Sequence, residues 1–180
     1  MSNSGEILST FVPGQEAVVE RAASVVRGAR RAGIPIIYVV VRFREGYPEV
    51  LPELLHRFSG RLLEGTPGAD IHPAVAPLPG DVVVTKRRTG PFSTTDLEAV
   101  LRAKGITTLV VMGVITGGCV LSTVRWAADV DYRLIVVSDG CADPDPDVHR
   151  VLVEKVFPRQ ATVMTAQDFL EFIAEASGTR

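Results

Sequence analysis

Cysteine and histidine are scarce in this chain of 180 residues, which contains two cysteines and three histidines. The first residues show no export signal, so we expect Cys119 and Cys141 to be free thiols rather than a disulfide. Asp-x-His occurs at Asp70-Ile71-His72 and at Asp147-Val148-His149, but the three histidines, His56, His72 and His149, are too far apart in the sequence for HxxxH spacing. The sequence therefore predicts no metal site.

Neither sign of charge dominates, and long apolar runs are absent. Nineteen basic and 21 acidic residues leave a net charge of −2, which predicts no general affinity for nucleic acid or anionic membranes. No apolar run approaches the roughly 18 residues that a membrane span needs. The opening residues lack the basic and apolar regions of a signal peptide. We expect a cytoplasmic protein whose partner is a small molecule.

Three common enzyme motifs are also missing. The chain has no G-x-G-x-x-G after an early strand and no G-x-x-x-x-G-K-[ST]. These absences argue against a Rossmann dehydrogenase and a P-loop enzyme. A serine-hydrolase elbow, G-x-S-x-G, is absent as well. We expect no cofactor.

What the sequence does contain is a regular alternation of strand and helix patterns. Strands are predicted at about 36–41, 82–86, 107–113, 133–138 and 161–164. Helices are predicted at about 15–32, 96–104, 118–130 and 146–157, with a last helix capped by Thr165. Thr95 and Glu98 form a candidate capping box, Asp145 is a candidate N-cap, and a long loop at about 43–80 holds one short helix near 52–57. Continuous apolar strands separated by helices predict one α/β domain, residues 1–180, with a parallel sheet covered on both faces.

The stretch Val114-Ile115-Thr116-Gly117-Gly118-Cys119-Val120 is the most informative part of the chain. An apolar run leads into it and a helical pattern follows it, so a thiol is predicted on a glycine-rich turn between a strand and a helix. Unpaired N–H groups of the first helical turn and the helix dipole favour a thiolate there. The alternative, a structural cysteine within a strand, fits the glycines less well.

Other strand ends carry residues that could meet this thiol, because ligands of open parallel sheets bind beyond the carboxyl ends of the strands. Lys86 ends one strand and Asp139-Gly140-Cys141 ends another. A lysine beside a thiol lowers the thiol's pKa and stabilises an anionic intermediate. The simpler interpretations are a solvated loop for Lys86, packing for Cys141, a turn cap for Asp139, and a surface or hydrogen-bonded side chain for His149.

Five motifs together resemble the isochorismatase-like cysteine hydrolases, and the resemblance extends from about residue 12 to 172. They are Phe43-Arg44-Glu45-Gly46-Tyr47-Pro48-Glu49, Val83-Val84-Thr85-Lys86-Arg87-Arg88, Phe92-Ser93-Thr94-Thr95-Asp96-Leu97, Gly113-Val114-Ile115-Thr116-Gly117-Gly118-Cys119-Val120 and Asp139-Gly140-Cys141-Ala142-Asp143.

The resemblance implies a three-layer α/β/α fold with a mainly parallel, Rossmann-like sheet of about five to six strands. It also implies an Asp–Lys–Cys triad in which Cys119 is the nucleophile and Lys86 the lysine. The predicted oxyanion hole uses backbone N–H groups at Thr116 and Cys119 in a turn that includes Gly118, with a non-proline cis bond between Ile115 and Thr116. The expected reaction cleaves a small amide, carbamoyl or related C–N bond through an acyl-enzyme.

The sequence departs from the family at its beginning, where an apolar strand should end in the triad aspartate. Alignment places Ser2 at that position, and Glu6 is the nearest carboxylate. We expect a truncated enzyme, so that activity of the chain as given is impaired. The alternatives are a sheet that closes up, with residues 4–10 or a neighbouring strand in the gap, and a natural pseudoenzyme.

Three functions remain open: a cysteine hydrolase, a non-catalytic binding or assembly module, and a thiol redox or acyl-carrier role. The third is disfavoured because the cysteines do not form a CxxC motif. Candidate substrate contacts are Arg42, Tyr47, Arg88 and Phe92, with Trp126 more consistent with packing. The resemblance further implies a homo-oligomer, a dimer or tetramer.

Overall fold

The computed structural model describes residues 15–58 and 60–178, which form five strands in two parallel sheets. One sheet pairs β1 (Ile37–Val41) with β2 (Val82–Lys86), and the other has the order β3 (Thr108–Val114), β4 (Arg133–Ala142), β5 (Thr162–Met164). The predicted parallel α/β class is confirmed. The expected first strand, Ser2 and Glu6 lie outside the described residues.

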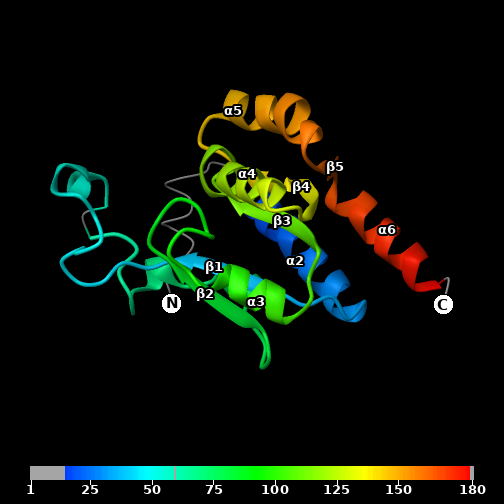
Figure 1. The fold of residues 1–180 in the computed structure, drawn as a ribbon, viewed down its shortest axis with the longest axis horizontal. Helices are drawn as coiled ribbons and strands as arrows, with labels where there is room; N and C mark the ends of the chain where they lie inside the picture. The colour runs from blue at the N-terminus through cyan, green and yellow to red at the C-terminus, as the bar shows by residue number, and fades with distance from the viewer. Residues whose placement is uncertain (1–14, 59, 179–180) are drawn as a thin grey trace.

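Helices cover both faces of the sheets, as the apolar strands predicted. Helices α2 (Gln15–Arg31) and α6 (Ala166–Gly178) pack against each other and against β4 on one face. The helices of the other face are α3 (Leu97–Ala103), α4 (Leu121–Asp129) and α5 (Pro146–Val151). Figure 1 shows α2 behind β3 and β4, with α4 in front of them. None of the described helices is long and apolar enough to cross a membrane.

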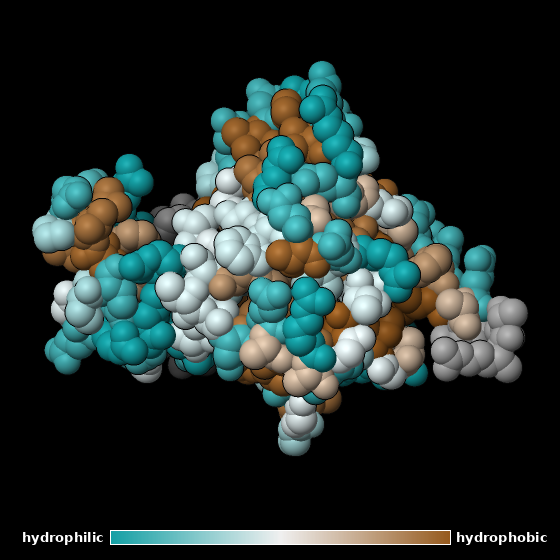
Figure 2. All heavy atoms as spheres, in the orientation of Figure 1, coloured by the Kyte–Doolittle hydropathy of each residue, from teal (hydrophilic) through white to brown (hydrophobic). Residues whose placement is uncertain are grey.

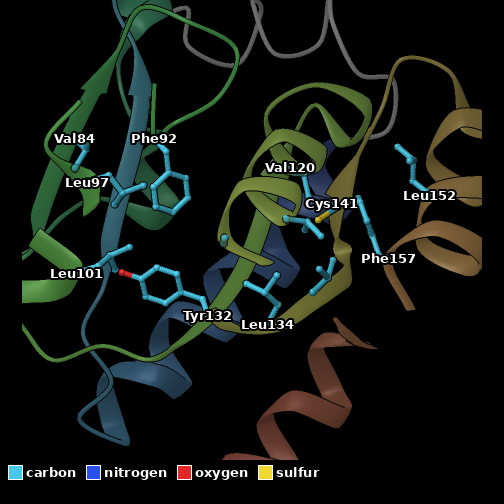
Figure 3. Close-up of a cluster of buried hydrophobic side chains, with 13 residues drawn as sticks. Val84, Phe92, Leu97, Leu101, Val120, Tyr132, Leu134, Cys141, Leu152 and Phe157 are labelled. Carbon is cyan, nitrogen blue, oxygen red and sulfur yellow. The ribbon is translucent and has the colours of Figure 1, made fainter. Parts of the chain in front are cut away.

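Each face of β4 is buried in its own apolar core. Val136 belongs to the core shared with α3, α4 and the segment after α5, parts of which are drawn in Figure 3. The next residue, Val137, belongs to the core formed with α2 and α6. Both valines are fully buried, because successive side chains of a strand point to opposite faces. Burial on both sides explains why this strand is continuously apolar.

Strand β4 is longer than predicted. It continues through Ala142, so Asp139-Gly140-Cys141 lies within the strand and not at its end. The register with β3 shifts between Val111 and Gly113, after which Gly113 pairs with Cys141. A Cβ on Gly140 would lie 3.2 Å from side-chain atoms of Met112 and Val137. This glycine therefore permits close packing inside a strand instead of ending it.

One predicted helix cap is wrong and another is confirmed, although α3 begins within one residue of its predicted start. Thr95 accepts a hydrogen bond from the backbone N–H of Leu97 at 3.2 Å, while Glu98 pairs with Arg102 instead of closing a capping box. Asp145 does cap α5, because its carboxylate accepts the N–H groups of Asp147 and Val148, at 2.9 and 3.4 Å.

The long loop after β1 folds into three short 3₁₀ turns, Pro52–Arg57, Pro67–Ala69 and Pro73–Val75. The first turn coincides with the short helix predicted near 52–57. Glu49 pairs with Arg44 and with Arg87, the latter at 2.8 Å. The loop projects from the two sheets in Figure 1, and Figure 2 shows apolar side chains at its far end. Ion pairs therefore tie a loop with little secondary structure to the end of β2.

Candidate active site

Cys119 lies in a π-helical turn, Thr116–Val120, between β3 and α4. Its thiol donates a hydrogen bond to the carbonyl of Val114, with an Sγ–O distance of 3.1 Å, and the side chain is partly buried. A Cβ on Gly117 would lie 2.9 Å from a methyl group of Val148 and 3.1 Å from a carboxylate oxygen of Asp143. Only glycine fits at that position without displacing these neighbours. The structure thus places the thiol at the strand-to-helix turn that the sequence indicated.

The cis peptide bond lies one residue earlier than expected, between Val114 and Ile115. The prediction of a cis bond between Ile115 and Thr116 is therefore wrong. The carbonyl of Ile115 accepts the N–H groups of Gly118 and Val120, at 3.1 and 3.3 Å. Ile115 is thus the first acceptor of the turn, and Thr116 is already part of the helical segment.

Lys86 ends β2 and is only 5% exposed. Its ammonium donates hydrogen bonds to the carbonyls of Arg88 and Thr89, at 2.9 and 2.8 Å. Burial lowers the pKa of Lys86, while the nearby charge of Cys119 acts in the opposite direction. The ion pairs among the described residues include none with Lys86.

A cavity of about 500 Å³ between β1 and β3 brings the predicted residues together. Its lining includes Lys86, Cys119 and Phe92, besides apolar side chains of both strands and of α2. Phe92 is buried and stacks on the half-exposed ring of Trp126, with ring centroids 6.1 Å apart. The lining therefore combines an ammonium, a thiol and aromatic rings with mainly apolar walls, to which Tyr38, His72, Thr108 and Thr123 add polar side chains.

The other predicted substrate contacts lie outside this lining and bind loop backbone. Arg42 donates to the carbonyl of Ala69 at 3.2 Å. The hydroxyl of Tyr47 donates to the carbonyls of Phe58 and Arg61. Arg88 donates to the carbonyl of Glu49 at 2.9 Å, which connects the end of β2 to the long loop. In the structure, these three side chains hold the loop.

Asp139 and Cys141 serve the packing of β4. Asp139 accepts the N–H of Ala166 at the start of α6 and pairs with Arg21 at 3.4 Å. Cys141 is 3% exposed, and burial raises its pKa to about 12. The packing interpretation of Cys141 fits these observations, and Asp139 caps a distant helix instead of the following turn.

The segment from the end of β4 into α5 contacts the Cys119 turn directly. A carboxylate oxygen of Asp143 accepts the N–H of Gly117 at 2.6 Å. The hydroxyl oxygen of Thr116 lies 2.9 Å from Nδ1 of His149, 33 positions along the chain. His149 is thus hydrogen-bonded, one of the two states expected for it. Sequence reasoning did not connect it to the turn, because neither spacing nor periodicity relates the two residues.

The described residues contain no group of three histidine, cysteine, aspartate or glutamate side chains that could hold a metal ion. Among the polar groups that line the cavity, Cys119 offers a thiol and Lys86 an ammonium, beside the side chains of Tyr38, His72, Thr108 and Thr123. These groups can supply a nucleophile and stabilise a negative charge.

The site therefore combines, within an α/β fold, a thiol at a strand-to-helix turn and a buried lysine that lines the same cavity. Comparison with known proteins shows which family has this arrangement. The isochorismatase domain family matches residues 9–168. The chain is 30% identical over 173 residues to a maleamate amidohydrolase of Pseudomonas putida, covering 93% of this chain and 80% of that protein.

Solved structures show the same relationship. A cysteine hydrolase from Pseudomonas syringae superposes with a TM-score of 0.85 at 26% identity, covering 92% of this chain and 84% of that one. An N-carbamoylsarcosine amidase from Thermoplasma acidophilum gives a TM-score of 0.72 at 32% identity, covering 86% and 85%. The chain belongs to the isochorismatase family and is a hydrolase of that family.

Proposed function

We propose that this hydrolase cleaves a small amide or carbamoyl C–N bond through a covalent intermediate on Cys119. The observation that carries the proposal is that Cys119 and Lys86 line the same cavity. Two relatives support the substrate class by name, a maleamate amidohydrolase and an N-carbamoylsarcosine amidase. The substrates in both names contain a planar carbonyl group bonded to nitrogen.

In the proposed reaction, the Cys119 thiolate attacks the carbonyl carbon and forms a C–S bond. Backbone N–H groups at Thr116 and Cys119 stabilise the resulting oxyanion, and the buried charge of Lys86 favours the anionic states. The C–N bond then breaks, and the amine leaves with the proton that the Cys119 thiol lost when it ionised. Water hydrolyses the thioester, which releases the acid and restores the thiol.

A panel of small amides and carbamoyl compounds, including maleamate and N-carbamoylsarcosine, tests this function by ammonia release. The unmodified chain is expected to turn over at least one compound, at an impaired rate because no carboxylate is paired with Lys86 among the described residues. Cys119→Ala should reduce release to the blank rate. Cys141→Ala is the matched control and should retain activity, because that thiol is buried in the core.

The alternative function is a non-catalytic binding or assembly module, favoured by the same missing carboxylate. It would be supported if every compound remains intact and iodoacetamide modifies Cys119 no faster than Cys141. Faster modification of Cys119, together with turnover that Cys119→Ala abolishes, would exclude it.

We further propose a cytoplasmic homo-oligomer, a dimer or tetramer. Exposed apolar side chains support self-association, among them Leu51 at 60% and Phe172 at 52% exposure. Light scattering after size exclusion measures the mass directly. A mass equal to 19.4 kDa at all concentrations would contradict the proposal.

A further inference from the structure

We propose that Asp143 and His149 are positioning residues that hold the Cys119 turn in the geometry needed for oxyanion binding. The inference rests on the proposed function for its catalytic consequence, but its physical content concerns the turn itself. The contacts of Asp143, Val148 and His149 with Thr116 and Gly117 form a clamp on the turn.

The first contact of the clamp fixes the backbone of the turn. The carboxylate of Asp143 accepts the N–H of Gly117 at 2.6 Å through one oxygen, and the N–H of Asp145 at 3.1 Å through the other. A charged acceptor makes a short, strong hydrogen bond to an amide. The same carboxylate thus joins the turn to the segment that begins α5.

The second contact fixes a side chain at the start of the turn. Thr116 is fully buried, so its hydroxyl requires a hydrogen-bond partner. Nδ1 of His149 supplies that partner at 2.9 Å. The N–H of Thr116 is one of the two proposed oxyanion donors. A rotation of this residue would therefore move a hydrogen-bond donor away from the oxyanion.

The third contact is steric. There is no room for a side chain at Gly117, because a Cβ would lie 2.9 Å from Val148 and 3.1 Å from Asp143. The clamp therefore approaches the turn on the side of Gly117 as closely as packing allows. Three independent contacts from one segment define both the orientation and the position of the turn.

The test compares a clamp-deleted variant, Asp143→Ala/His149→Leu, with a conservative variant, Asp143→Asn/His149→Asn. Asparagine keeps an acceptor oxygen at position 143, and its amide can replace Nδ1 of histidine at position 149. Asp145→Ala is the matched control, because it removes the cap of α5 without touching the turn.

Hydrogen exchange of the backbone amides is the first readout and requires no substrate. Clamp deletion should raise exchange of the amides in Thr116–Val120 by about tenfold or more, with β4 unchanged. Asp145→Ala should raise exchange in α5 more than in the turn. The conservative variant should return the turn to within about threefold of the unmodified chain. Unchanged exchange in the turn after clamp deletion would overturn the inference.

Steady-state kinetics is the second readout. Clamp deletion should lower kcat by about 10- to 100-fold and leave KM within about twofold, because the oxyanion donors act in the transition state. A merely structural role would lower activity through the fraction unfolded and would lower it equally in Asp145→Ala. Full kcat after clamp deletion overturns the inference even if the proposed function holds. If no compound is turned over, the proposed function fails and hydrogen exchange alone decides the inference.

A second variant, Gly117→Ala, changes the turn instead of the segment that contacts it. The added methyl group should displace the segment and raise exchange in the turn. Adding Val148→Ala removes the closest of the clashing atoms and should restore part of the protection. Equal exchange in Gly117→Ala and the unmodified chain would contradict the steric part of the inference.

Discussion

Lys86 carries a positive charge into the interior of the molecule. Two backbone carbonyls accept hydrogen bonds from its ammonium, and burial lowers its pKa below the ordinary value of 10.5. Carbonyl dipoles compensate only part of the loss of hydration of an ammonium group. This lysine therefore costs folding free energy, as expected if it has the catalytic role proposed above.

Replacing Lys86 by methionine should abolish amide hydrolysis and raise the free energy of unfolding by about 1 kcal/mol at neutral pH. The lysine is charged in both the folded and unfolded states below its lowered pKa, so the burial cost is then complete. As the pH rises through that pKa toward 10.5, the folded state loses the proton first and the cost disappears. The stability gap between variant and unmodified chain should therefore close with rising pH.

Urea unfolding at neutral and alkaline pH measures this gap. Lys104→Met is the control, because it removes a charge from an exposed position near the end of α3. A Lys86→Met chain that is less stable at every pH would show that the unpaired carbonyls cost more than the buried charge.

At the scale of elements, the start of α6 shows the reciprocal hydrogen bonds that α3 lacks. Asp168 accepts the backbone N–H and the hydroxyl of Thr165, at 3.2 and 2.7 Å, and the Thr165 hydroxyl oxygen accepts the N–H of Asp168. The predicted cap by Thr165 is therefore confirmed. A short carboxylate side chain at the third position of the helix suits this geometry.

Asp168→Asn should lower Tm at neutral pH. Hydrogen bonds from the side chain and backbone of Thr165 lower the pKa of Asp168 below its ordinary value of 3.8. A carboxylate with a lowered pKa stabilises the folded state above 3.8, and this contribution is lost as the pH falls through the lowered value. Thermal unfolding between neutral and acid pH should show the two Tm curves converging. Gln167→Ala, at the neighbouring exposed position, should change Tm little, and a gap that persists in acid would refute the capping role.

For the whole molecule, the main feature is the separation of the two sheets. β1 and β3 face each other across the cavity of about 500 Å³, and α2 covers it with apolar side chains. The described residues thus form one three-layer fold in which the layer of strands is interrupted. The side chains that line such a cavity make fewer van der Waals contacts than side chains in a closely packed core.

Leucine substitutions at two buried alanines test whether the two sheets are separated by open space. Ala29 lines the cavity, whereas Ala127 lies in the closely packed core of α4. Ala29→Leu should leave the free energy of unfolding unchanged or raise it by about 1 kcal/mol, because the added carbons enter open space. Ala127→Leu should lower it by about 1–3 kcal/mol through overpacking. Equal losses in the two variants, measured by urea unfolding, would show that the sheets are not separated in solution.

The sequence predicted the positions of helices, strands and turns correctly where they depend on a pattern within one short segment. Apolar runs located all five described strands, and the glycines before Cys119 located the turn. The end of β4 was misplaced because Gly140 is tolerated inside the strand by close packing with β3 and with Val137. The contact between Thr116 and His149 was not predicted, because it joins residues 33 positions apart.

The parallel α/β class and the position of a thiol between a strand and a helix could be predicted from the sequence alone. Both follow from the spacing of apolar residues and glycines within short segments. Three further features are visible only in the folded chain: Lys86 shares a cavity with Cys119, Arg42 and Tyr47 bind loop backbone, and α5 contacts the turn. These contacts depend on how segments that are distant in the sequence pack together. The periodicity of apolar residues within one segment does not specify such contacts.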